Sequence, residues 1–159
     1  MTHRIIRSAA FCLGLACFAG AASAEGVAGS WKFRTDALPS NGCFISGDIA
    51  FTKTAKADEF ACVFVSQEDC LNADGVKTFQ KVRQSCSAHV AGRQVVITSK
   101  VERMLDAGPA SLRERLMRFS SYAPDNFAVE LNNKGELTGQ FQSLQKSGVR
   151  FWRDVDLVS

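Results

Sequence analysis

Residues 127–141 read FAVELNNKGELTGQF, and this stretch decides the fold. Apolar and polar residues alternate on both sides of a turn, Asn132-Asn133-Lys134-Gly135, whose residue types tolerate positive φ. Alternation with period two on either side of such a turn predicts an antiparallel β-hairpin. Its apolar face comprises Phe127, Val129, Leu131, Leu137, Gly139 and Phe141.

The same period continues on both sides of this hairpin. After it, one face carries Val149, Phe151, Val155 and Leu157, and the other carries Arg150, Trp152, Asp154 and Asp156. Before it, turn sequences separate alternating segments at residues 31–36, 43–53, 60–66, 78–88 and 94–105. The sequence therefore predicts a mainly β domain of about eight antiparallel strands in meander order.

One segment departs from this period. Ser111-Leu112-Arg113-Glu114 matches a capping box, and Leu112, Leu116 and Phe119 follow at roughly helical spacing. We expect a short helix at residues 111–119, which interrupts the sheet as a lid or a connector.

Closure into a small barrel is the expected architecture, because it removes the exposed edges of the sheet. A two-sheet sandwich is the alternative. The inward positions of most strands hold Phe, Ile, Val or Leu, which are large enough to fill an eight-stranded interior or to leave only a narrow cavity. At this length we expect one domain, at residues 25–159.

The N-terminus has the three parts of a cleavable signal peptide. Arg4 and Arg7 form a basic stretch, residues 9–19 are apolar, and Ala22-Ser23-Ala24 is a small-residue cleavage site. We expect residues 1–24 to be removed and the mature protein to be periplasmic or secreted. A lipid-modified Cys17 as the new N-terminus is the alternative. No later apolar run is long enough to span a bilayer, so we expect no stable membrane insertion after cleavage.

The numbers of basic and acidic residues bear on the kind of partner that the protein can bind. The chain has 19 basic and 16 acidic residues, and loss of Arg4 and Arg7 leaves 17 and 16. This near balance gives no support for a nucleic-acid partner or for binding to an anionic membrane surface.

The mature chain keeps four cysteines, Cys43, Cys62, Cys70 and Cys86. An even number in an oxidising compartment favours two disulfides. A zinc site is the competing interpretation, but no C-x-x-C occurs and the spacings match no common zinc finger.

Hairpin arithmetic favours one disulfide pairing, because facing residues of an antiparallel hairpin sum to a constant. A turn at residues 54–58 places Cys43 opposite a residue close to Cys70, and a turn at residues 72–75 places Cys62 opposite a residue close to Cys86. We therefore expect Cys43–Cys70 and Cys62–Cys86. The alternative is Cys43–Cys62 with Cys70–Cys86.

Gly29-Ser30-Trp31 opens the first predicted strand, just inside the mature N-terminus. It resembles the G-x-W start of lipocalins and avidins, the calycin type of barrel. The resemblance implies that Trp31 plugs one end of an antiparallel barrel and packs under an arginine of the last strand, for which Arg150 and Arg153 are available. It implies an architecture and no ligand.

The segment around residues 112–127 is the most suggestive candidate for recognition. On a helix Arg115 and Arg118 face the same way, so with Tyr122 they are placed to grip a carboxylate, a phosphate or an acidic partner. A solvated face is the competing interpretation. The candidate binding residues are Arg113, Arg115, Arg118, Tyr122, Asp125 and Asn126, together with Trp152, an aromatic on the polar side of the last strand.

The remaining titratable residues form no pattern that indicates a catalytic or metal site. His89 is the one histidine left after cleavage, so a multi-histidine metal site is excluded and a catalytic pair has a single possible base. The pairs Asp58-Glu59 and Glu68-Asp69 lie in turn-like sequence, which favours solvated surface charge. We expect no metal, no cofactor and no catalytic residues.

Two classes of function therefore compete for this chain, and an enzyme ranks third. The first is a non-enzymatic protein-binding module, such as an inhibitor or an envelope accessory factor. The second is a barrel that binds a small hydrophobic or anionic ligand. A filled core favours the protein binder, whereas an aromatic-lined cavity favours the ligand binder.

Overall fold

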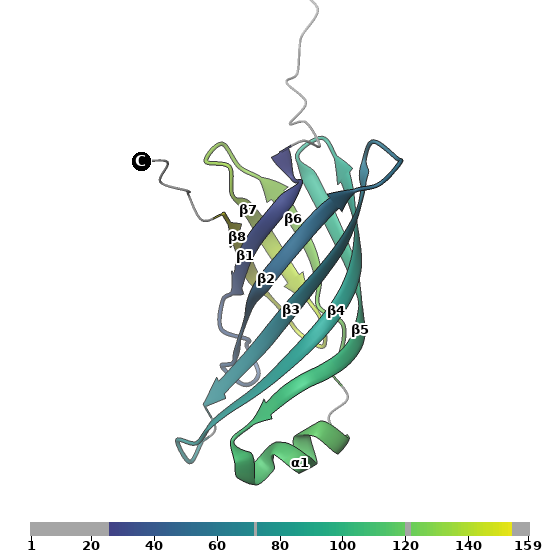
Figure 1. The fold of residues 1–159 in the computed structure, drawn as a ribbon. Coiled ribbons are helices and arrows are strands. Elements are labelled where there is room, and N and C mark those ends of the chain that lie inside the picture. The colour runs from purple at the N-terminus through teal and green to yellow at the C-terminus, as the bar shows by residue number, and fades with distance from the viewer. Residues whose placement is uncertain (1–25, 72, 120–121, 154–159) are drawn as a thin grey trace, which may run out of the picture.

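The computed structural model describes residues 26–153 except residue 72 and residues 120–121. Eight antiparallel strands pair in chain order, and β1 pairs with β8 to close a barrel (Figure 1). The strands are β1 (Gly29–Thr35), β2 (Phe44–Lys53), β3 (Glu59–Leu71), β4 (Lys77–Ala91), β5 (Gln94–Gly108), β6 (Asn126–Leu131), β7 (Leu137–Gln142) and β8 (Lys146–Trp152). The prediction of a mainly β barrel is confirmed, and the sandwich is excluded.

The strands differ in length, and this gives the barrel two unlike ends. β3, β4 and β5 have 13, 15 and 15 residues, whereas β6 and β7 have 6 each. The long strands run past the short ones toward helix α1 (Ala110–Phe119), which contacts β5 (Figure 1). We call this end the mouth; besides α1 it carries the described residues 36–43, 73–76, 122–125 and 143–145, which lie between strands.

The long strands correct the predicted bounds. β3 continues to Leu71 and β5 to Gly108, beyond the predicted ends at residues 66 and 105. Alternation of apolar and polar residues fades there, because these strand ends project past the barrel core. Pairing with the neighbouring long strands continues all the same, from Ser66 opposite Val82 to Leu71 opposite Lys77.

An aromatic cluster fills the interior. The ring of Phe127 lies 5.1–6.0 Å from the rings of Phe33, Phe64, Phe141 and Phe151, and all five side chains are at most 2% exposed. The filled interior is the outcome that the large inward residues predicted.

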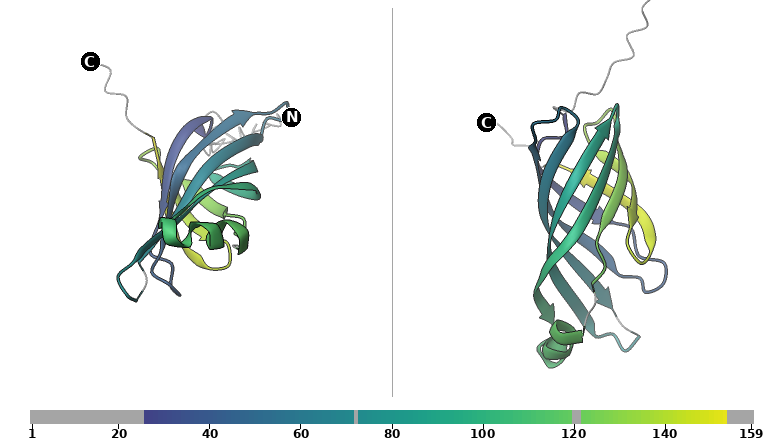
Figure 2. Two further views of the ribbon diagram at one scale, coloured as in Figure 1. Left: turned by 60° about the horizontal axis from the view of Figure 1, so that its bottom comes forward. Right: turned by 90° about the vertical axis from the view of Figure 1, so that its right-hand side faces the viewer.

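Trp31 closes the end opposite the mouth, where both ends of the described chain lie (Figure 2). Its indole Nε1 donates to the Val27 carbonyl at 2.9 Å. The Arg153 guanidinium stacks 4.2 Å from the ring and donates to the carbonyls of Gly26 and Ala28, each at 2.7 Å. Arg153 is therefore the arginine that packs on Trp31, an arrangement compatible with a calycin-like barrel.

One disulfide joins the residue just before β2 to β3, and the other joins β3 to β4. Cys43 is bonded to Cys70, and Cys62 to Cys86, with Cα–Cα distances of 4.3 and 4.8 Å. These are the pairs that the hairpin arithmetic predicts. Cys62 lies directly opposite Cys86 in the register of β3 and β4.

The bounds of the helix agree closely with the sequence prediction. Helix α1 begins one residue before the predicted helix and ends at the predicted residue. No helix in the described part of the chain is long and apolar enough to cross a membrane. The expected signal peptide, Val155 and Leu157 lie outside the described residues.

Candidate functional site

The loop of residues 36–43 folds over the mouth, and we call it the lid loop. Its own backbone hydrogen bonds shape it: Leu38 N donates to the Cys43 carbonyl at 2.7 Å, and Gly42 N donates to the Leu38 carbonyl at 2.8 Å. Gly42 has φ +66°, a conformation that favours glycine. The Leu38 side chain is 3% exposed and belongs to the core. The lid loop therefore packs against the barrel interior through this residue.

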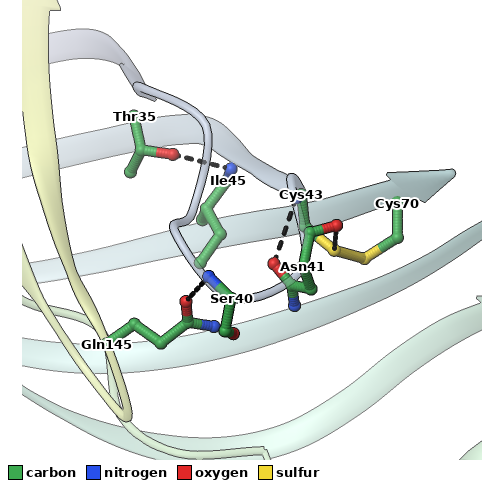
Figure 3. The surroundings of a disulfide bond; sticks show 7 residues. All are labelled: Thr35, Ser40, Asn41, Cys43, Ile45, Cys70 and Gln145. Carbon is green, nitrogen blue, oxygen red and sulfur yellow. Dashed lines mark hydrogen bonds between the residues drawn. A yellow bond between two sulfur atoms is a disulfide. The ribbon is translucent and has the colours of Figure 1, made fainter. Parts of the chain in front are cut away.

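The lid loop is fastened at both sides (Figure 3). The disulfide from Cys43 to Cys70 joins it to β3. Ser40 N donates to the Gln145 side-chain oxygen at 2.9 Å, which joins it to the turn between β7 and β8. Its position is therefore fixed by one covalent bond and by a contact with residues over 100 positions away.

A pocket of about 190 Å³ lies beside the lid loop, and we call it the mouth pocket. Its apolar walls are Leu38, Ile45, Phe141 and Leu144; its polar lining includes Asn41, Glu68, Gln80, Tyr122, Ser143 and Gln145. These residues come from the lid loop, β2, β3, β4, the segment before β6, β7 and the β7–β8 turn. Convergence of polar groups over an apolar wall is typical of a small-ligand site.

Glu68 is the one acid that lines this pocket. Its side chain is half-buried, and burial raises the pKa of the carboxyl above its ordinary value, partly offset by a hydrogen bond with the Asn41 side chain. The ion pairs of the described residues do not include Glu68. The sequence reading of Glu68 as solvated surface charge was wrong, because β3 continues through it; Asp69 is exposed as expected.

A buried polar network lies between the mouth pocket and the aromatic core, centred on Asp125. Its Oδ2 accepts hydrogen bonds from Ser66 Oγ at 2.8 Å, Gln84 Nε2 at 2.6 Å and the Tyr122 hydroxyl at 3.1 Å. Ser66, Gln84 and Asp125 are fully buried. Asp125 Oδ1 is buried without a hydrogen-bond partner in the described part of the chain.

The network also holds the chain in place where it enters β6. Gln84 Oε1 accepts from Asp125 N at 3.0 Å and from Ser99 Oγ at 2.9 Å. Asn126 Oδ1 accepts from Ser99 N at 2.9 Å. Side chains of β3, β4 and β5 thus position the segment that carries Tyr122 to the mouth pocket.

Burial dominates the electrostatics of the network. It raises the pKa of Asp125 from 3.8 to about 6, although the hydrogen bonds from Ser66, Gln84 and Tyr122 lower it. Burial and the nearby Asp125 charge also raise the pKa of Tyr122, so its hydroxyl stays protonated and donates at neutral pH.

Asp125 predicts a pH dependence of stability. Between pH 3.8 and about 6 the folded state holds a proton that the unfolded chain has lost, so the free energy of unfolding falls as pH rises through this window. The difference in pKa corresponds to about 3 kcal/mol. We expect Asp125→Asn to remove this fall, as seen in the difference between urea-unfolding curves of variant and wild type. Equal slopes for both proteins would contradict the assignment.

A second concave surface lies on the outer wall of β7, β8 and β1, and we call it the outer groove. It has a volume of about 590 Å³ and is lined by Arg34, Thr35, Asp36, Ala37, Phe44, Thr138, Gly139, Gly148, Val149, Arg150 and Trp152. The guanidinium of Arg34 lies 4.7 Å from the Phe44 ring centre, and that of Arg150 lies 5.2 Å from the Trp152 ring centre.

The predicted binding residues lie in three different parts of the structure: helix α1, the buried network and the outer groove. Arg113 pairs with Asp106 at 2.9 Å and Arg118 with Glu114 at 3.3 Å, while Arg115 is exposed on α1. Tyr122, Asp125 and Asn126 belong to the buried network, and Trp152 lines the outer groove. Tyr122 lines the mouth pocket, and the described lining of this pocket includes none of the three arginines, so a joint binding surface of Arg115, Arg118 and Tyr122 stays a prediction.

Sequence reasoning missed Ser66, Gln84, Arg34 and Phe44. A signal existed for two of them: Ser66 and Gln84 are polar residues on the inward faces of β3 and β4, where neighbouring positions are apolar. Nothing in the pattern marks Arg34 and Phe44, since outward arginines are ordinary on a solvated wall.

One group of described residues has metal-ligand atoms close together. The sulfurs of Cys43 and Cys70 and the Glu68 carboxylate lie within 4.8 Å of one another. The two sulfurs are joined in a disulfide, so neither can serve as a thiolate ligand.

Taken together, fold and sites define a small disulfide-bonded, closed antiparallel barrel with a covered mouth. Comparison with protein-family models, curated proteins and solved structures finds no match to this chain.

Proposed function

We propose that this chain is an exported, non-enzymatic binding module whose mouth pocket takes a small organic molecule with a basic group. The observation that carries the proposal is the half-buried Glu68 carboxylate, which has no ion-pair partner among the described residues and lies in a pocket lined by seven segments of the described chain. A ligand ammonium supplies the missing positive charge, and charge-assisted hydrogen bonds are the strong ones.

The pocket walls suit the part of such a ligand that lies outside its basic group. Leu38, Ile45 and Phe141 offer apolar contact for a hydrocarbon body. The Tyr122 hydroxyl, which donates its hydrogen to Asp125, can still accept a hydrogen bond, and the Gln145 amide nitrogen can donate one. A volume of about 190 Å³ equals about six water molecules, so the ligand is small. The acid at the pocket argues against the anionic ligand that the sequence left open, and the filled interior argues against a larger hydrophobic one.

Export is supported by the two disulfides. Such bonds persist in oxidising compartments and are rare in the cytosol. The proposal that the protein is periplasmic or secreted rests on these bonds together with the N-terminal sequence.

The test uses phenethylamine as the probe and Glu68→Gln as the variant. Loss of a hydrogen bond to a charged group costs about 1.5 to 3 kcal/mol, so we expect affinity to fall about 10- to 100-fold by calorimetry or NMR titration. Affinity should also fall as pH is lowered and Glu68 becomes protonated. Because its pKa is raised, this loss begins at a higher pH than for an ordinary carboxyl group.

Asp69→Asn is the matched control, since it removes the same charge from the exposed neighbour on β3. It should leave the affinity unchanged. Phenylpropionate, which has a similar size and the opposite charge, should not bind. No binding of phenethylamine, or equal binding to the Glu68→Gln variant, would refute the proposed site.

A protein-binding function is the second candidate. The filled interior favours it, as does the outer groove, where arginine and aromatic side chains of the kind enriched at interfaces lie exposed.

A further inference from the structure

Two arginine–aromatic stacks lie side by side on the outer groove. Arg34 packs over Phe44, which is 37% exposed, and Arg150 packs over Trp152. Stacking covers one flat face of each guanidinium and leaves its N–H edges available for planar hydrogen bonding to a carboxylate. The side chains of Arg34 and Arg150 are thus oriented before any partner arrives.

The two arginines are also direct neighbours. Arg34 on β1 is the register partner of Arg150 on β8, and both residues are exposed. Like charges directly opposite one another destabilise a sheet. Among the described residues Arg34 forms no ion pair, and Arg150 meets only Glu136, at 4.0 Å. The described lining of the outer groove therefore holds two arginines and one acid, Asp36, and none of the ion pairs among the described residues joins Asp36 to either arginine.

Gly148 lies next to this pair on the outward face of β8. A Cβ at this position would collide with the Asp36 carboxylate, so the glycine makes room for one acid in the outer groove. Phe44 and Trp152 lie on opposite sides of the arginine pair, so an apolar side chain of a partner can pack beside a charged one.

We infer that the outer groove docks a segment of a partner protein that carries carboxylates flanked by apolar side chains. Charge complementarity selects this occupant: a carboxylate bridging Arg34 and Arg150 relieves their repulsion, and apolar neighbours pack on Phe44 and Trp152. The groove lies on the outer wall, so this inference is independent of the ligand proposed for the mouth pocket.

The test uses the blocked pentapeptide ELDLE and its uncharged counterpart QLNLQ. We expect the disulfide-intact domain to bind ELDLE, with NMR shifts of the Trp152 indole and an affinity that falls as salt is raised. The variant with Arg34→Gln and Arg150→Gln should bind at least tenfold more weakly. Its melting temperature should equal or exceed that of the wild type, because the variant removes a like-charge pair.

Arg115→Gln, an exposed arginine of α1, is the matched control and should bind like the wild type. Three results would overturn the inference: no binding of ELDLE, equal binding of QLNLQ, or a lower melting temperature in the double variant with unchanged binding. The last result would make the stacks purely structural. Loss of peptide binding in Glu68→Gln would place the peptide in the mouth pocket instead.

Discussion

A variant with both Cys43 and Cys70 replaced by alanine is expected to lose about 3 kcal/mol of stability and to bind phenethylamine about tenfold more weakly. The lost stability follows from the 27-residue separation of the two cysteines, because a crosslink restricts the unfolded chain. The weaker binding has a local cause: the disulfide fastens the lid loop, and a freed loop must be ordered again when the ligand binds.

The second disulfide provides the control. Cys62 and Cys86 are separated by 24 residues, so their replacement by alanine should cost a similar amount in urea unfolding. This bond joins β3 and β4 within the core cluster and does not contact the lid loop, so the affinity should stay at the wild-type value. Equal weakening by both variants would show that the lid loop has no specific part in binding.

Phe127→Ala is expected to cost the most stability of any single substitution proposed, about 3 to 5 kcal/mol. Phe127 contacts four other rings at 5.1–6.0 Å and is 2% exposed, so truncation opens a cavity at the centre of the aromatic cluster. Chemical unfolding followed by tryptophan fluorescence measures the loss.

Phe127→Leu serves as the comparison because it keeps most of the side-chain volume. It should cost clearly less than the alanine variant. Val96→Ala, at a residue that is 50% exposed on β5, should change stability by less than about 0.5 kcal/mol. A small loss for Phe127→Ala would mean that the interior collapses around the missing ring and is not tightly packed.

Much of the fold was predictable because the relevant interactions are local or follow from strand register. Phe127 is the second residue of β6 and Phe141 lies opposite it on β7, as the alternation around Asn132 to Gly135 predicts. The same register arithmetic placed Cys43 with Cys70 and Cys62 with Cys86, since it depends only on where the turns lie.

The sites were predicted less well, and Glu68 and Tyr122 illustrate why. Glu68 lies in polar sequence without a strand pattern, yet β3 extends through it because β2 and β4 supply partners on both sides. Tyr122 was predicted to bind a ligand together with Arg115 and Arg118, and its hydrogen bond to Asp125 in the buried network was not foreseen. Neither position follows from neighbours in the chain.

The sequence by itself determined the mainly β class, the meander order and the short helix, and it favoured the observed disulfide pairs over one alternative, because alternation, turn residues and register act over a few residues or between adjacent strands. Only the tertiary structure decided what lies at the mouth and on the outer wall. Asp125 meets Ser66 and Gln84 across the barrel, and Arg34 meets Arg150 only when β1 closes on β8. Such contacts join residues 41 to 116 positions apart, where local pattern carries no information about distance.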